Sequence, residues 1–263
     1  AGHRAGRDAV HRTIEAAPSL EIDVLTLYAF SGDNWQRPPA EVSLLMSLFR
    51  RTLDAERRRC RREGIRLRVI GRRDRLEPDL VDAIERTEAA TADGTTMALR
   101  LAIDYSGRDA IVRAAEIAGA TRIWGVGLED EQAAAGRRPA SFRRNDPQRR
   151  PASFRRNDPQ RRPASVRKND SAREIFRRCL AAAIHDDDTP DVDLLIRTGR
   201  ELRISDFLLW EAAYAELWFT DRMWPDFSAA DLTDAVHAYR GRIRRFGGLT
   251  TQESGKEAAH GEV

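Results

Sequence analysis

The chain has 263 residues, of which 41% are hydrophobic and 33% are charged, and its formal net charge is +3. This length suffices for one α/β domain with a sizeable core. No apolar run approaches the roughly twenty residues that span a bilayer, and the first residues lack the apolar core of a signal peptide, so we expect a soluble, cytoplasmic protein. Two distant cysteines, Cys60 and Cys179, exclude a disulfide framework and a cysteine metal site.

The first half of the chain alternates between helical and strand patterns. Helices are expected at residues 3–17, 40–63, 77–92 and 108–118, and strands at residues 22–30, 67–70 and 96–103. The strand at residues 22–30 is expected to be buried. The helix at 40–63 has one apolar face, which consists of Val42, Leu45, Met46, Phe49 and Leu53.

A basic segment interrupts this pattern. Residues 137–148 recur without change at 149–160, and a variant of the same twelve residues follows at 161–172. The segment 137–172 holds eleven Arg and one Lys against three Asp, a net charge of +9, which leaves the rest of the chain at −6. Its regular prolines and few apolar residues predict a disordered insert. We favour a neutral repeat expansion, while binding to an anionic membrane or to nucleic acid stays an alternative.

The second half resumes the alternation. Helices are expected at residues 172–184, 207–214 and 229–246, and strands at 192–196 and near Leu217. The pattern predicts an α/β fold, a single domain with a mostly parallel central sheet flanked by helices. The insert divides this domain into residues 1–136 and 173–248, and residues 249–263 form a flexible tail. Because the basic excess is confined to the insert, no nucleic-acid partner is expected for the domain.

The most informative segment follows the strand at 192–196. Arg197 and Arg203 stand six residues apart, with Glu201 between them and Ser205 after them. Two guanidinium groups and a hydroxyl at the carboxyl end of a buried strand can hold a diphosphate by charge-assisted hydrogen bonds. The alternative is a surface loop in which the arginines pair with Glu201 and Asp206.

Together with residues 25–38, this segment closely resembles the cis-prenyltransferases, the undecaprenyl diphosphate synthase family. The resemblance runs from Gly2-His-Arg-Ala-Gly6 to Arg244-Arg-Phe-Gly-Gly248, interrupted by the insert. It implies the cis-prenyltransferase fold and an enzyme that elongates an allylic diphosphate with isopentenyl diphosphate, with Mg²⁺ as cofactor. The closing motif at 244–248 implies a homodimer. The lipid product would suit a peripheral membrane contact.

The resemblance also implies roles for individual residues. It places three residues near the reacting atoms: His3, Ser31 and Asn34. It assigns six to the substrates: Trp35, Arg37, Arg197, Glu201, Arg203 and Ser205. Glu216 corresponds to the family carboxylate that helps to place Mg²⁺, although by itself it would be taken for an ion-pair residue. Trp35 has simple packing as its alternative, Glu41 belongs to the same motif, and Arg108 is expected to be structural.

Six positions depart from the family motifs: Gly32, Asp33, Asp104, Ser106, Arg200 and Asp206. Arg200 stands where the family has a glycine, so it either adds a cation near a phosphate or crowds the loop. Asp104 and Asp206 replace asparagines, and Ser106 replaces a glycine. These departures make a short-chain or specialised synthase an alternative to a synthase of a long polyprenyl carrier.

The family also has an Asp-Gly-Asn-Gly-Arg segment upstream of the Gly-His pair, and no such segment occurs in these 263 residues. We therefore expect the first strand of the fold to be missing from this chain. We also expect little transferase activity from these residues alone. A catalytically inactive partner subunit is a further alternative, and product length and allylic primer stay open.

Overall fold

The computed structural model describes residues 2–120 and 171–242, with side chains from residue 5 onward. It divides into two compact units. The first comprises Ala1–Ala16, Asp191–Ile204 and Glu211–Val263, and the second comprises Ala17–Pro190 and Ser205–Trp210. We call them the first and second unit and describe each by itself. Most of the predicted insert 137–172 and the whole tail at 249–263 lie outside the described residues.

The second unit is built on a parallel sheet with the strand order β1-β3-β2. Its strands are β1 (Val24–Ser31), β2 (Ile65–Ile70) and β3 (Met97–Tyr105). β3 is the central strand, and all its residues except Ala98 are buried, as the apolar composition of a central parallel strand predicts. β1 has only Phe30 buried. The prediction of a buried first strand was therefore wrong, because β1 lies at an edge of the described sheet.

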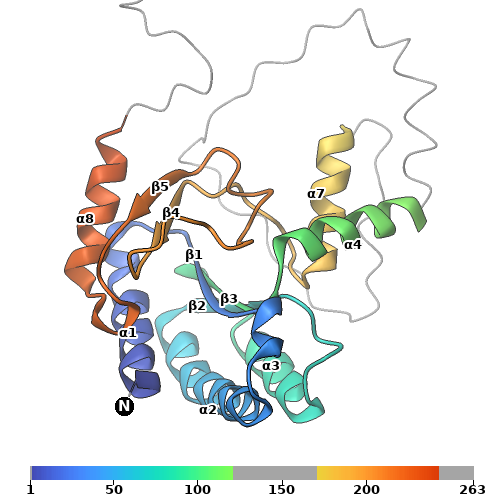
Figure 1. Cartoon of the computed structure of the whole chain (residues 1–263), viewed down its shortest axis with the longest axis horizontal. Coiled ribbons are helices and arrows are strands. Elements are labelled where there is room, and N and C mark those ends of the chain that lie inside the picture. The colour runs from blue at the N-terminus through green and yellow to red at the C-terminus, as the bar shows by residue number, and fades with distance from the viewer. Residues whose placement is uncertain (1, 121–170, 243–263) are drawn as a thin grey trace, which may run out of the picture. The chain divides into compact units, whose positions relative to one another are not determined.

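Two helices cover β2 in this unit. They are α2 (Pro39–Glu63) and α3 (Pro78–Ala90), which pack against each other as well as on the strand (Figure 1). Each helix starts with a proline at its first position, where no N–H partner is needed. The left-handed Gly64, with φ of 67°, ends α2 directly before β2. The predicted apolar stripe of α2 is confirmed, since none of its five residues is exposed.

The second unit also contains α4 (Gly107–Ala120) and α7 (Ala172–Ala183), which pack against each other (Figure 1). Ser171 caps α7 by accepting a hydrogen bond from the backbone N–H of Glu174 at 3.3 Å. The end of this helix contacts the sheet, because the N–H of Gly71 donates to the carbonyl oxygen of Ile184 at 3.0 Å.

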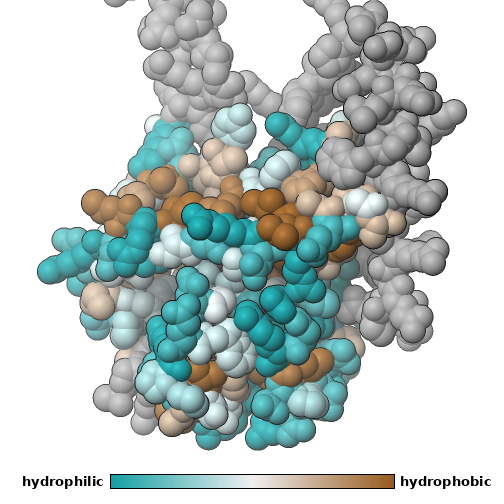
Figure 2. All heavy atoms as spheres, turned by 45° about the vertical axis from the view of Figure 1, so that its right-hand side comes forward, coloured by the Kyte–Doolittle hydropathy of each residue, from teal (hydrophilic) through white to brown (hydrophobic). Residues whose placement is uncertain are grey.

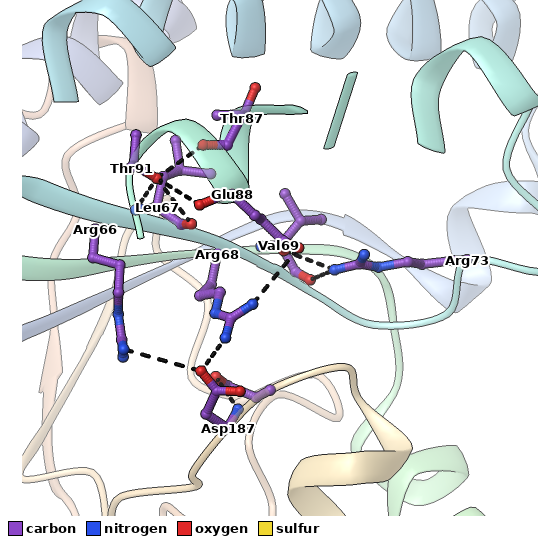
Figure 3. A network of polar contacts seen from close by, with 10 residues as sticks. Arg66, Leu67, Arg68, Val69, Arg73, Thr87, Glu88, Thr91 and Asp187 are labelled. Carbon is purple, nitrogen blue, oxygen red and sulfur yellow. Dashed lines mark hydrogen bonds and ion pairs between the residues drawn. The ribbon is translucent and has the colours of Figure 1, made fainter. Parts of the chain in front are cut away.

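The outer edge of β2 is closed by side chains of α3 (Figure 3). Thr91 Oγ1 accepts the N–H of Leu67 at 3.1 Å, and Glu88 Oε1 accepts the N–H of Val69 at 2.9 Å. Glu88 also accepts a hydrogen bond from Arg73 Nη2 at 2.7 Å. Burial raises the pKa of Glu88, although the neighbouring Arg73 opposes this. The edge strand thus has backbone donors paired without a further strand.

Two arginine side chains of β2 extend toward the segment that follows α7. Figure 3 shows Arg66 and Arg68 extending from the strand toward Asp187, which follows α7. Arg68 forms an ion pair with Asp187, and Arg66 Nη1 lies 4.0 Å from the same carboxylate. On β3, Arg100 Nη2 lies 2.6 Å from Asp186 Oδ2. Burial, with Arg68 nearby, lowers the pKa of Arg66. Paired charges thus join the strands to the segment after α7.

The first unit combines two helices with a parallel strand pair. Its elements are α1 (Gly2–Ala16), β4 (Leu194–Arg197), β5 (Glu216–Phe219), the 3₁₀ turn η3 (Trp224–Asp226) and α8 (Ala229–Arg240). β4 and β5 pair in register from Leu194 with Glu216 to Arg197 with Phe219. Arg12 of α1 donates to the carbonyl oxygens of Pro225 and Phe227, at 2.9 and 3.1 Å.

The predicted helix at residues 207–214 is wrong, because this stretch forms turns. Ser205, Asp206 and Leu208 have φ of 49°, 62° and 49°, which a right-handed helix does not allow. The parallel pairing of the strands is confirmed, although β4 and β5 form a separate sheet. None of the helices that the structure describes is long and apolar enough to cross a membrane.

Large apolar side chains are exposed on both units. Figure 2 shows apolar residues gathered on one face among hydrophilic ones. Independently of that view, the exposed large apolar side chains of the first unit include Leu202, Tyr214, Leu217 and Met223, of which Leu202 is 78% exposed. Exposed apolar groups of this kind suit an interface with another molecule.

Candidate active site

Four of the predicted site residues lie where β1 ends, in the second unit. Ser31 closes β1, and the 3₁₀ turn η2 (Gly32–Gln36) follows it at once. Asn34 Oδ1 accepts the N–H of Ser31 at 3.0 Å. The asparagine side chain thereby fixes the turn and sets the direction of its own amide group. Ser31 and Asn34 are therefore joined within this turn, and their role near the reacting carbons stays a prediction.

Trp35 has a defined packing role in this turn. Its Nε1–H donates to Asp104 Oδ1 at 2.8 Å, and its ring meets Phe30 edge to face with centroids 5.4 Å apart. Arg75 donates from Nε to Asp104 Oδ2 at 2.9 Å, and its guanidinium lies 5.6 Å from the centre of the Trp35 ring. The packing alternative for Trp35 is therefore the role that these contacts support.

Arg37 lies just after η2 and is half exposed. Its Nη1 donates to Glu41 Oε1 at 2.9 Å, and Glu41 stands in the first turn of α2. Such an exposed pair contributes about 0.3–0.5 kcal/mol, so a more highly charged anion can displace the carboxylate from Arg37.

In the first unit, Arg197 is the last residue of β4. Its Nε atom is buried and has no hydrogen-bond partner among the described residues. Gly199 and Arg200 then turn the loop with φ of 84° and 65°. Their N–H groups donate to the carbonyl oxygens of Arg222 and Thr220, at 2.7 and 3.2 Å. Arg200 therefore adopts the backbone conformation that favours glycine, and the loop keeps its turn.

The rest of the arginine-rich motif is exposed. Arg203, with 64% of its side chain exposed, forms an ion pair with Glu201. This ion pair leaves the assignment of Arg203 to substrate as a prediction. Asp206, the other acid of the ion-pair alternative, instead bonds Ser106 and the start of α4. Ser205 is exposed and lies in the second unit, directly after the last residue of this loop in the first.

Glu216 is the first residue of β5 and is ion-paired. Its Oε2 accepts a hydrogen bond from Arg242 Nη1 at 2.7 Å. Among the residues that the structure describes, no three His, Cys, Asp or Glu side chains lie together as a metal site. A carboxylate is nevertheless a suitable Mg²⁺ ligand when substrate phosphates and waters complete the coordination. Glu216 therefore suits Mg²⁺ only as a single protein ligand, with the other ligands supplied by substrate and water.

The structure brings Ser31, Asn34, Trp35 and Arg37 together at the end of β1. Arg197 ends β4, whereas Glu216 begins β5 at the opposite end of this parallel strand pair, so the two are not brought together by the pairing. Ser205 belongs to the second unit.

His3 lies in α1, and its side chain is not among those described. The motif at 244–248 also lies outside the described residues. Arg75 belongs to no motif that indicates a role, and Asp104 and Ser106 stand out in the sequence only as departures from the family. An acid at 104 with an arginine at 75 was the signal that could have indicated their pairing.

Comparison with known proteins identifies the chain. Residues 1–247 match the family model described as "Putative undecaprenyl diphosphate synthase". Isoprenyl transferase 1 of Bradyrhizobium diazoefficiens is 44% identical over 248 residues, which cover 94% of this chain and 80% of that protein. A Salmonella paratyphi A protein named ditrans,polycis-undecaprenyl-diphosphate synthase ((2E,6E)-farnesyl-diphosphate specific) is 40% identical over 247 residues, 94% of this chain and 81% of its own length.

A solved structure agrees with these relatives. Lavandulyl diphosphate synthase from Lavandula x intermedia, in complex with dimethylallyl diphosphate, superimposes with a TM-score of 0.70 at 29% identity, covering 94% of this chain and 88% of that one. The predicted α/β fold and the predicted enzyme class are both confirmed by these similarities. The chain therefore belongs to the undecaprenyl diphosphate synthase family, whose members are isoprenyl diphosphate synthases.

Proposed function

We propose that this chain condenses isopentenyl diphosphate with an allylic diphosphate to give a Z-configured polyprenyl diphosphate. One observation carries the assignment of the substrate site. Arg197 stands at the carboxyl end of a parallel strand and has a buried Nε–H without a protein acceptor among the described residues. Other buried arginines share the second property, so its combination with the strand end supports the assignment. A buried donor of this kind is costly unless a ligand satisfies it, and a diphosphate supplies charged acceptors.

The family resemblance also assigns Arg203 and Ser205 to isopentenyl diphosphate. Arg203 is held by Glu201 at the surface, where an exposed ion pair contributes at most about 1 kcal/mol. A diphosphate carries more charge than one carboxylate, so it displaces Glu201 from the guanidinium. Ser205 adds a neutral hydroxyl donor.

Mg²⁺ is the proposed cofactor, and Glu216 would hold it. When bound, the ion neutralises charge on the diphosphate leaving group. Arg242 holds Glu216 in place by their hydrogen bond of 2.7 Å and must share the carboxylate with the ion. The exposure of the pair, 39% and 30% of the two side chains, permits that exchange.

The residues at the end of β1 would serve the reacting carbons and the allylic diphosphate. Asn34 is oriented by its bond to the Ser31 N–H, so its amide group is fixed beside the Ser31 hydroxyl. Arg37 is exposed and available to a phosphate once it leaves Glu41. His3 is proposed for proton transfer because imidazole titrates near neutral pH. Trp35 positions this turn through Asp104.

Two further proposals concern assembly and product. We propose a homodimer, which the exposed apolar side chains of the first unit support. We place the enzyme in the cytoplasm, with a peripheral membrane contact for delivery of its lipid product. A short-chain product is the second candidate, because the solved neighbour binds dimethylallyl diphosphate, a five-carbon allylic diphosphate.

Binding tests the proposed substrate site directly. Isothermal titration calorimetry of the 263-residue chain with isopentenyl diphosphate should show one site per chain. Arg197→Gln should weaken it at least about tenfold, because one charge-assisted hydrogen bond contributes about 1.5–3 kcal/mol. Arg50→Gln is the matched control, since Arg50 is a half-exposed arginine paired with Asp79 on the helices α2 and α3. Equal affinities for both variants would contradict the assignment of Arg197. Because little turnover is expected from these residues alone, binding and not product formation is the test of the substrate site.

A further inference from the structure

The segment that follows the arginine-rich loop has an unusual backbone. Ser205, Asp206 and Leu208 have φ of 49°, 62° and 49°, the left-handed region that residues with a side chain rarely adopt. Three such residues within four positions are unfavourable unless surrounding contacts hold them. The contacts around Asp206 therefore decide where Ser205 lies.

Asp206 is attached to the start of α4 by three hydrogen bonds. Its carbonyl oxygen accepts the N–H of Gly107 at 2.9 Å, and its Oδ1 accepts the N–H of Arg108 at 3.0 Å. Its Oδ2 accepts the hydroxyl of Ser106 at 2.5 Å. Ser106 Oγ in turn accepts the N–H of Asp109 at 3.1 Å, so it caps the same helix. The carboxylate is favourable there because helix N-termini carry partial positive charge.

The close approach needs a glycine at position 107. A Cβ atom there would lie 2.7 Å from the carbonyl oxygen of Asp206 and 2.8 Å from Leu209 Cγ. The next residue is fixed from the other side: the Phe207 ring stacks on Tyr28, with centroids 4.4 Å apart and planes 9° apart. Leu208 is buried. The attachment is thus specific rather than a loose surface contact.

Two departures from the family motifs meet in this attachment. Ser106 and Asp206 are 100 positions apart in the sequence, yet their side chains share a hydrogen bond. The serine hydroxyl needs an acceptor, and Asp206 Oδ2 provides one where asparagine would carry an amide nitrogen. Each departure therefore accounts for the other.

We propose that Asp206, locked by Ser106, is a positioning residue that holds the Ser205 hydroxyl in place for isopentenyl diphosphate. This inference rests on the proposed function, because Ser205 is assigned there to that diphosphate. Asp206 itself points its carboxylate at α4 and does not touch the substrate. Its contribution is to hold Ser205 in its left-handed conformation, which would otherwise relax.

A double-mutant cycle tests the proposal in the full 263-residue chain. Its variants are Asp206→Asn, Ser106→Gly and the double substitution, which restores the family pair. Isopentenyl diphosphate affinity is measured by calorimetry and unfolding by urea. Asp206→Asn should weaken binding about tenfold, because the loss of a charged hydrogen bond loosens a substrate group. The double variant should recover to within about threefold of the parent, since neither partner is then left unpaired.

Ser228→Gly is the matched control. Ser228 Oγ donates to Asp231 Oδ2 at 2.6 Å at the start of α8, so the variant breaks a similar serine-to-aspartate bond at another helix start. It should lower stability as Ser106→Gly does while leaving affinity unchanged.

The results of these measurements distinguish a failure of the positioning role of Asp206 from a failure of the proposed substrate site. If the parent binds isopentenyl diphosphate and Arg197→Gln weakens it, but Asp206→Asn changes affinity less than twofold, the positioning role is overturned and the substrate site stands. If the parent does not bind, or Arg197→Gln has no effect, the proposed function fails and the inference fails with it. Loss of affinity without recovery in the double variant also overturns the specific pairing with Ser106.

Discussion

Asp104 holds Trp35 by a hydrogen bond of 2.8 Å from the indole Nε1–H to Oδ1, although the two residues belong to different elements, β3 and η2. The carboxylate is fully buried and also binds Arg75. The turn that contains Ser31 and Asn34 is therefore attached to the central strand of the sheet through Trp35.

Removing the Asp104 carboxylate should loosen this turn. Asp104→Ala leaves the Trp35 N–H and the Arg75 guanidinium without their acceptor, so we expect a loss of about 2–4 kcal/mol in unfolding free energy. Asp104→Asn should cost less, about 1 kcal/mol, because asparagine keeps one acceptor and tolerates the φ of 53° at this position. Urea denaturation measures both. Equal losses for the two variants would contradict the role of the acceptor.

Glu88 should matter more than any exposed acid of α3. Glu88→Ala removes the acceptor of the Val69 N–H and the partner of Arg73, so we expect a loss of about 3–5 kcal/mol. Glu88→Gln keeps an acceptor for Val69 and should fall between that variant and the parent. The control is Glu85→Ala on the exposed side of the same helix, which should stay within about 0.5 kcal/mol of the parent.

Two glycine-to-alanine substitutions should change the free energy of unfolding in opposite directions. Gly71 has φ of 123°, and an added Cβ would lie 2.1 Å from the carbonyl oxygen of Ile103, so Gly71→Ala should cost more than about 4 kcal/mol or prevent folding. Gly119 lies within α4 with no atom within 4 Å of an added Cβ. Gly119→Ala should therefore gain about 0.5–1 kcal/mol from helix propensity. Thermal unfolding of the two variants is the measurement, and a stable Gly71→Ala variant would contradict the close approach of Gly71 to Ile103.

Arg200 should be replaceable by the glycine of the family with a gain in stability. Its φ of 65° strains a residue with a side chain, and its side chain is exposed. We expect Arg200→Gly to raise the unfolding free energy by about 0.5–1 kcal/mol, since the relief of strain exceeds the added freedom of the unfolded chain. Isopentenyl diphosphate affinity of the same variant decides whether Arg200 also serves as a third cation. A weaker affinity would show that it does.

His185 should make stability depend on pH. Burial, together with Arg73 and Arg113 and opposed by Asp74, lowers the pKa of His185 to about 4. An unfolded histidine titrates near about 6.5, so between these values the unfolded chain binds more protons and stability rises with pH. This contribution is complete above about pH 6.5 and is lost as the pH falls toward about 4.

The neighbouring groups restrict hydration of the imidazole, yet His185 keeps a large solvent-exposed surface, and we give more weight to that exposure. We therefore expect an effect of about 1 kcal/mol or less. His185→Asn removes the titration and tolerates the φ of 60°. Urea denaturation of parent and variant at several pH values between 4 and 7 measures the difference in slope. Identical slopes would show that His185 does not contribute.

Local patterns predicted much of the fold, because helix periodicity and strand composition are local properties. The apolar stripe of α2 and the buried β3 follow from them. The apolar residues Phe207 and Leu208 suggested a helix in the same way, yet their burial comes from tertiary contacts, with Phe207 stacked on Tyr28. The sequence around them does not encode that partner. The positive φ at Asp206 also depends on the distant N-terminus of α4.

In the candidate site, too, contacts between distant segments could not be predicted from local sequence. The motifs predicted that Arg197 stands at the carboxyl end of a strand, and the structure places it there, while Asn34 lies in the turn η2 after β1. They did not indicate that Arg75 and Asp104 attach Trp35, because these residues come from three separate segments. Bonds between residues about 30 to 100 positions apart, such as Ser106 to Asp206, have no local signature. Departures from a family motif that occur in pairs are the feature of the sequence that indicates them.

Because the edge of β2 is closed, a further strand can pair with the three-stranded sheet at one edge only. Because Thr91 and Glu88 occupy the backbone donors of Leu67 and Val69, β2 cannot act as a template for a neighbouring strand. Any strand that joins this sheet, from a distant segment or another molecule, has to enter beside β1. Two copies therefore cannot associate through their β2 edges, which protects the chain from that route to aggregation.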